Sequence, residues 1–140
     1  MQRPEIIDEE VIFDGGRLLS ETDIKGKLLY VNRKFCEMSG YSKEEVLGKP
    51  HSVLRHPDMP KTAFKELWDT IKTGEQWSGY VKNLRKDGRY YWVIVDIIPK
   101  RDDAGEIIGY MASRKVPDGS FESTKTHYQK LLEAEKTLNI

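Results

Sequence analysis

The sequence predicts an α+β domain in which one five-stranded antiparallel sheet carries short helices on one face. Three observations lead to this class. Two short apolar runs flank a glycine turn within residues 18–31, and three longer runs rich in aromatic and β-branched residues fill 77–116. Helical patterns occupy the stretch between them. Short turns join each set of strands, so we expect neighbouring strands to run antiparallel.

Composition limits the classes of function. A chain of 140 residues suits one domain with modest extensions, and its 23 basic and 23 acidic residues balance. We therefore expect no nucleic-acid partner. No apolar run is long enough for membrane insertion, and the polar N-terminus lacks a signal-peptide core. The single cysteine, Cys36, excludes an internal disulfide. These features favour a cytoplasmic protein.

The N-terminal part divides at Gly15-Gly16. Apolar residues within 1–17 recur at roughly helical spacing, which predicts an N-terminal arm or a short cap helix. The runs 18–23 and 27–31 flank Ile24-Lys25-Gly26 and predict a hairpin.

Three helices are expected next. Residues 32–40 form a short one that ends at Gly40, and Ser42 with Glu45 has the spacing of a capping box for a second. In the third, residues 61–73, the apolar stripe falls at i, i+3, i+4 and i+7 and consists of Phe64, Leu67, Trp68 and Ile71.

The C-terminal half alternates between strands and turns. Residues 77–86, 90–100 and 107–116 are predicted strands, and Asp87-Gly88 is a strong hairpin signal. Residues 121–140 return to a helical pattern. Both faces of the strand 90–100 are apolar, whereas a sheet with one solvated face alternates. We expect the outer face to be covered by the N-terminal arm, the C-terminal helix or a second subunit.

The segment 51–60 concentrates polar chemistry between two prolines. Arg55 and His56 offer donors suited to a pyrophosphate or a ring carbonyl. Asp58 suits a ribose hydroxyl, or it holds Arg55 in place. A plain surface loop, in which Asp58 caps the helix 61–73 or pairs with Arg55, is the alternative.

The strand 77–86 places Trp77, Gly79, Val81 and Asn83 on one side. If that side faces the helices, Trp77 supplies a stacking plate and Gly79 leaves room for a flat ring. The Asn83 amide both donates and accepts, which suits the edge of a flavin or purine. Alternatively, Trp77 is simply core and Asn83 lies at a strand end.

Signals for catalysis are missing. The chain has no nucleophile elbow, no phosphate-binding Walker loop and no dinucleotide fingerprint, and Cys36 beside Phe35 suits a small buried apolar role. His51 and His56 lack a zinc-like spacing, although either can in principle ligate a haem iron. We therefore expect no enzyme and no metal site.

Several motifs taken together resemble a PAS domain over residues 18–117. They are Glu21-Thr22-Asp23 with Gly26 and Tyr30-Val31-Asn32, the run 35–41, the run 44–50, and Lys86-Asp87-Gly88 before Tyr91-Trp92-Val93. Within PAS domains the chain is similar to the flavin-binding Aer-type energy-taxis receptors. That narrower resemblance is carried by His51, the run 55–60, Phe64 with Leu67-Trp68, Trp77-Ser78-Gly79 and Val81-Lys82-Asn83.

The resemblance implies a redox sensor with non-covalent FAD. It implies that Arg55, His56 and Asp58 hold the FAD, that Trp77 contacts the flavin and that Asn83 reaches its polar edge. It adds three further cofactor-binding candidates, Trp68, His51 and Asn32. Photosensing is disfavoured, because the run 48–54 lacks the reactive cysteine of LOV domains.

The same resemblance implies an organisation and partners. Residues 1–17 form the arm or cap helix, 18–117 the PAS sensor domain and 118–140 a linker or signalling helix. The expected partners are a second copy, bound through the outer sheet face and the arm, and a membrane-bound chemoreceptor or another signalling output domain. Two alternatives remain: a ligand-free PAS interaction module, and a haem-binding gas sensor that uses His51 or His56.

Overall fold

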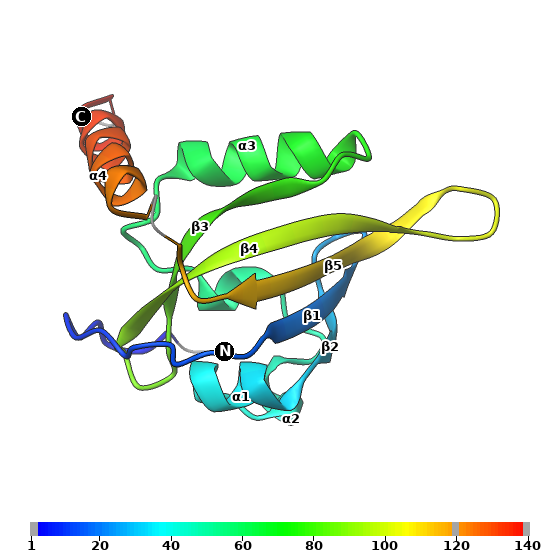
Figure 1. Cartoon of the computed structure of the whole chain (residues 1–140), viewed down its shortest axis with the longest axis horizontal. Helices are drawn as coiled ribbons and strands as arrows, with labels where there is room; N and C mark the ends of the chain where they lie inside the picture. The colour runs from blue at the N-terminus through cyan, green and yellow to red at the C-terminus, as the bar shows by residue number, and fades with distance from the viewer. Residues whose placement is uncertain (1–2, 119–120, 139–140) are drawn as a thin grey trace.

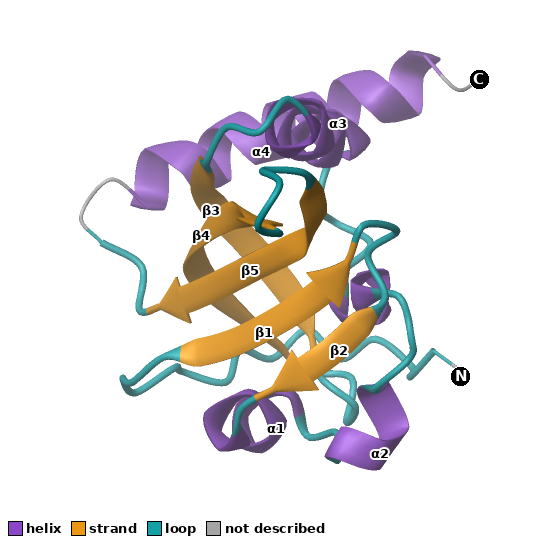
Figure 2. Ribbon diagram, turned by 90° about the vertical axis from the view of Figure 1, so that its right-hand side faces the viewer, coloured by secondary structure: helices purple, strands orange, loops and turns teal. Residues whose placement is uncertain are grey.

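The computed structural model describes residues 3–118 and 121–138, so the ends of both predicted terminal segments and residues 119–120 lie outside it. One antiparallel sheet has the strand order β2-β1-β5-β4-β3 (Figure 2). This confirms the predicted α+β class. The strands are β1 (Leu18–Asp23), β2 (Leu28–Val31), β3 (Trp77–Leu84), β4 (Tyr90–Arg101) and β5 (Ile107–Lys115).

The helices of the middle segment cover one side of the sheet, which we call the inner face. In Figure 1, α3 lies at the top and α1 and α2 lie at the bottom. The predicted capping box is present, because Ser42 Oγ accepts from the Glu45 N–H at 3.2 Å and Glu45 Oε1 accepts from the Ser42 N–H at 3.0 Å. The elements are α1 (Arg33–Ser39), α2 (Lys43–Val46), the 3₁₀ turn η1 (His51–Leu54) and α3 (Lys61–Lys72).

The N-terminal segment is an extended arm, and its described part contains no helix. Its backbone bonds to the β3–β4 hairpin: Ile7 N–H donates to the Gly88 carbonyl at 2.8 Å, and Val11 N–H donates to the Tyr90 carbonyl at 2.7 Å. These long-range bonds use the donors that a helix would need for itself, so the apolar spacing does not produce the alternative cap helix.

The C-terminal helix α4 (Phe121–Leu138) covers the β3–β4 half of the outer face. The Phe121 ring centroid lies 5.6 Å from that of Tyr80 and 5.1 Å from that of Trp92. The Tyr128 hydroxyl donates to the Tyr80 carbonyl at 2.9 Å. Over this half, the C-terminal helix therefore covers the apolar outer side of β4. It is one of the three coverings expected from the sequence.

The far end of α4 passes the β3 edge and reaches α3 (Figure 1). Pro60 gives the start of α3 no side-chain cap. Glu135 accepts instead from the backbone N–H groups of Lys61 at 2.8 Å and Thr62 at 3.0 Å. A carboxylate at a helix N-terminus also interacts favourably with the helix dipole. The two helices are thus fastened at the point where the 51–60 segment enters α3.

The other half of the outer face stays open. A groove of about 260 Å³ runs over β1, β2, β4 and β5. Its apolar side chains include the exposed Leu19, Tyr30, Ile98 and Met111. In the described part of the chain, no helix has the length and apolar character needed to cross a membrane.

Replacing Gly88 should loosen the arm. Gly88 has φ of +92°, and an added Cβ would overlap the Glu5 carbonyl oxygen. Gly105 has φ of +82° with open space around it, so Gly105→Ala is the matched control. In both variants the new alanine must adopt a left-handed backbone conformation, which costs about 1–2 kcal/mol. Gly88→Ala should lose more unfolding free energy and should also speed hydrogen exchange at the Ile7 and Val11 amides. Equal exchange in the two variants would contradict the arm contact.

Candidate functional site

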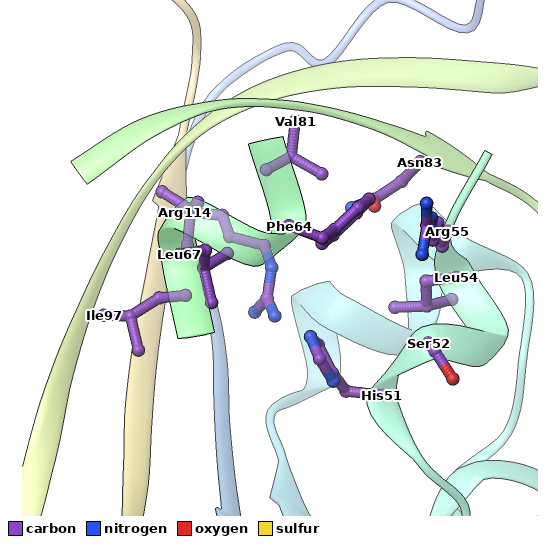
Figure 3. A pocket seen from close by; sticks show the side chains of 11 residues that line it. His51, Ser52, Leu54, Arg55, Phe64, Leu67, Val81, Asn83, Ile97 and Arg114 are labelled. Atoms are coloured by element: carbon purple, nitrogen blue, oxygen red, sulfur yellow. The ribbon is translucent and has the colours of Figure 1, made fainter. Parts of the chain in front are cut away.

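A cavity lies between the inner face and the helices η1 and α3 (Figure 3). It encloses about 30 Å³ of free space, so its side chains must move apart to admit a ring. We call it the inner cavity. Most of its wall is apolar and consists of Leu54, Phe64, Leu67, Val81, Val95 and Ile97.

The polar groups of the inner cavity come from three places in the chain. His51, Ser52 and Arg55 belong to η1 and the residue after it, Asn83 lies on β3 and Arg114 lies on β5. No aspartate or glutamate is among the described residues that line it. The described lining therefore combines an apolar wall with two arginines and contains no carboxylate.

Arg55 is placed by backbone pairing with the free edge of β3. Arg55 forms a bridge with Asn83, and the His56 N–H donates to the Lys82 carbonyl at 3.3 Å. In such a strand-like segment successive side chains point to opposite sides. Arg55 accordingly faces the cavity, where its guanidinium lies 4.1 Å from the Phe64 ring centroid.

His56 and Asp58 lie on the other side of that edge. The buried His56 ring meets the Tyr90 ring edge-on at 5.8 Å, and its Nδ1 accepts from the Asp58 N–H at 3.0 Å. Asp58 pairs with Lys82 at 3.3 Å and is largely exposed. Neither residue lines the inner cavity. The structure thus separates Arg55 from the two neighbours with which the sequence groups it.

Tyr91 carries an unsatisfied polar group in the core. It is the direct partner of Asn83 across β3 and β4, on the inner face. The Asn83 amide lines the cavity, and the Tyr91 hydroxyl is buried without a geometric hydrogen-bond partner in the described part of the chain. Burial raises the Tyr91 pKa to about 12, against the smaller opposing effects of Arg114 and Asn83. Buried polar groups normally find partners, so the Tyr91 hydroxyl is a marker for a ligand.

Trp77 is on the inner face as predicted, but its ring does not line the inner cavity. The indole lies over Gly79, where an added Cβ would overlap its Cη2 atom. The space that Gly79 provides is therefore filled by Trp77 itself rather than left for a second flat ring.

Trp68 and His51 line a neighbouring hollow of about 20 Å³. It shares His51, Leu67, Ile97 and Arg114 with the inner cavity. The Trp68 ring lies edge-on to His51 and to Tyr110, with 5.7 Å between centroids in each pair. Trp68 therefore lies behind His51, one layer from the inner cavity.

Asn32 has a structural position at the start of α1. Its Oδ1 accepts from the Phe35 N–H at 2.9 Å and the Leu19 N–H at 3.1 Å, and its Nδ2 donates to the Arg17 carbonyl at 2.9 Å. The amide is fully used in joining α1 to β1, and it does not line the inner cavity.

Comparison with known proteins identifies the family of this chain. The PAS fold family matches residues 28–113. The chain belongs to the PAS-fold family. This confirms the resemblance on which the sequence analysis relied.

This PAS domain is 46% identical over 101 residues to the aerotaxis receptor of Escherichia coli strain K12, which covers 72% of the chain and 20% of the receptor. It is 30% identical over 118 residues to the nitrogen fixation regulatory protein of Klebsiella oxytoca, covering 83% of the chain and 24% of that protein. The chain thus spans about a fifth to a quarter of these curated relatives.

A solved structure with the same fold is the light state of the blue-light photoreceptor Aureochrome1 LOV. It matches with a TM-score of 0.68 and 25% identity, covering 86% of this chain and 91% of that one. The PAS domain is thus similar to sensory and regulatory proteins.

Sequence reasoning missed two residues, Arg114 in the cavity lining and Tyr91 in the core opposite Asn83. Tyr91 looked like one more aromatic in an apolar strand. Arg114 carried a usable signal, because alternation along β5 places it on the same side as Tyr110 and Ala112, the inner side. In the described part of the PAS domain, no three histidine, cysteine or acidic side chains gather as a metal site would require.

His51 should make stability depend on pH. Burial, together with the charges of Arg114 and Arg55, lowers its pKa to about 4. The unfolded side chain titrates near 6.5, so between pH 6.5 and 4 the unfolded state binds a proton that the folded state does not. Stability should fall with decreasing pH in this window, by up to about 1.4 kcal/mol per unit from His51.

Urea denaturation of wild-type protein and of His51→Gln at pH 7, 6, 5 and 4.5 measures this contribution. His51→Gln should have the smaller loss of unfolding free energy on acidification. His127→Gln, at an exposed histidine of α4, should follow the wild type. If His51→Gln keeps the full wild-type slope, the buried neutral state of His51 is refuted.

Proposed function

We propose that this PAS domain is a cytoplasmic redox sensor that binds the flavin ring of FAD in the inner cavity and passes the redox state to a signalling partner. One observation carries the proposal: an apolar cavity on the inner face is lined by the polar side chains of Asn83, Arg55 and Arg114, and its described lining contains no carboxylate. A flavin ring has an apolar edge and a polar edge with donors and acceptors, and it matches both parts. The resemblance to Aer-type receptors, now supported by 46% identity to an aerotaxis receptor, points to the same cofactor.

The size of the cavity limits how much of the ligand it can hold. With about 30 Å³ of free space it must widen to take the ring system, and the dinucleotide tail must extend outside. Arg55 and Ser52 line the cavity, and an arginine fork matches phosphate oxygens. We propose that Arg55 binds the pyrophosphate, with His56 and Asp58 as positioning residues that hold its segment on the β3 edge.

The other predicted residues receive more limited roles. His51 lies in the cavity wall and Trp68 supports it, so both are proposed to shape the ring site. Trp77 is proposed to form the wall behind Gly79. The bonds of Asn32 fix α1, and we propose no contact with the cofactor. Cysteinyl photochemistry is not proposed, because Cys36 lies on α1 outside the cavity lining.

A path for the signal runs through β3 and β4. These strands hold Asn83 and Tyr91 on the inner face and Tyr80 and Trp92 under α4 on the outer face. A change in the hydrogen bonds of the ring edge therefore acts on strands that contact α4 directly. Only a difference in contacts between redox states can shift such an equilibrium. A membrane-bound chemoreceptor or another output domain is the proposed recipient.

Freshly purified protein should be yellow, with a structured flavin band in the blue, and ligand-free protein should take up FAD. Arg55→Ala should weaken FAD binding about tenfold to a hundredfold, since a charge-assisted hydrogen bond contributes about 1.5–3 kcal/mol. Arg33→Ala, at an arginine whose side chain is 93% exposed on α1, is the matched control and should bind as the wild type does. Fluorescence titration measures both.

Two results would overturn the flavin proposal. A colourless protein that binds no FAD on reconstitution would refute it. A Soret band in place of a flavin spectrum would select the haem alternative, for which His51 is the cavity histidine.

The open half of the outer face favours a second, compatible function as a dimerisation module. We propose that another copy of this chain covers the groove over β1, β2, β4 and β5, with the N-terminal arm taking part. Exposed apolar patches of this kind mark interaction surfaces. Leu19, Tyr30, Ile98 and Met111 are the apolar residues that a partner would bury.

Light scattering over a range of concentrations tests the dimer. The wild type should reach the mass of two chains, and Met111→Glu should remain at one because it places a charge in the groove. Ile108→Glu changes an exposed residue of the same strand outside the groove and should leave the dimer intact. A wild type with the mass of one chain throughout would exclude this interface.

A further inference from the structure

Arg114 is a buried arginine on the inner side of β5. It is paired with Leu18 of β1 and Val95 of β4, and only 6% of its surface is exposed. Figure 3 shows its guanidinium extending into the inner cavity, towards His51. It lines both the inner cavity and the neighbouring hollow, and so lies where the two meet.

Most of the hydrogen-bonding capacity of Arg114 is unused. Its Nη1 donates to Ser20 Oγ at 3.0 Å and lies 3.4 Å from the Leu18 carbonyl. The guanidinium carbon lies 5.5 Å from the Phe35 ring centroid. The group has five N–H donors, and those of Nε and Nη2 have no acceptor within the described residues. Arg114 also has no ion pair in that part of the chain.

The surroundings offer Arg114 no compensating charge. The described lining of the two hollows contains no carboxylate, and the second charge in the inner cavity is another arginine, Arg55. His51 between them is neutral near pH 7, since its pKa is about 4. Burial also lowers the Arg114 pKa, as expected for a cation removed from water. A buried charge without a partner costs several kcal/mol, so the empty cavity is an unfavourable place for this side chain.

We propose that Arg114 binds the negatively charged edge of the ring that occupies the inner cavity, and so makes the site prefer the anionic form of its ligand. The inference rests on the proposed function for the identity of that ring. The oxidised flavin ring is neutral. Two electrons from a reductant such as dithionite and one proton from water convert it to the reduced anion. The guanidinium gains a counter-ion in that form only.

A purely structural role makes the opposite prediction. If Arg114 serves to tie β5 to β1 through Ser20 and Leu18, its loss should weaken the ligand-free protein. If Arg114 instead serves to bind a ligand, replacing it with a neutral residue should leave the ligand-free protein as stable or more stable. The reason is that an uncompensated buried charge is removed. Stability without ligand therefore separates the two roles.

The test compares Arg114→Gln and Arg114→Lys with the wild type, with Arg17→Gln as the control for an exposed arginine that also bonds to β5. Thermal unfolding of the flavin-stripped proteins comes first. Arg114→Gln should melt at or above the wild-type temperature. A variant that melts lower than Arg17→Gln, or fails to fold, would overturn the proposal.

Flavin binding comes second, with oxidised FAD and with FAD reduced by dithionite. Arg114→Gln should lose at least tenfold more affinity for the reduced form than for the oxidised form, which lowers the midpoint potential by about 30 mV for a two-electron couple. Arg114→Lys, which keeps the charge, should recover part of the difference. Equal loss for both forms would refute the charge preference. A wild type that binds no flavin would refute the proposed function. The comparison of melting temperatures would still decide whether Arg114 serves a ligand or the fold.

Discussion

The pairing of the segment after η1 with the free edge of β3 organises the rest of the site. It closes the inner cavity, directs Arg55 inward over Phe64 and sends His56 outward under Tyr90. It also fixes the direction in which the chain enters α3, whose first N–H groups are capped from α4 by Glu135. One short stretch of backbone hydrogen bonds therefore connects the cavity wall, the outer face and the C-terminal helix.

The polar and charged groups of the inner cavity lower the stability of the protein but prepare the cavity to bind a ligand. The Tyr91 hydroxyl leaves hydrogen-bonding capacity unused, and two arginines line a cavity whose described lining has no carboxylate. Each feature is costly in an empty protein, because desolvation is not compensated. Together on the inner face, these features favour an occupant with a flat body, a polar edge with donors and acceptors, and negative charge.

Much of the fold could be predicted because its signals are local. Gly40 and Gly74, the Ser42–Glu45 box and the Asp87-Gly88 turn act within a few residues, and the structure has elements that begin and end accordingly. The arm could not be predicted as extended, because its hydrogen bonds go to a hairpin some eighty residues later. Arg55, His56 and Asp58 looked like one cluster because proximity in sequence does not show which side of an edge each occupies.

The close contact between Trp77 and Gly79 ties the composition of one strand to the place of its largest side chain. Because the indole lies in the space that a side chain at 79 would take, any larger residue there must displace the ring. Position 79 thus sets where the Trp77 ring packs on the inner face. Related chains with a larger residue at this position would be expected to keep the strand but to pack the tryptophan elsewhere.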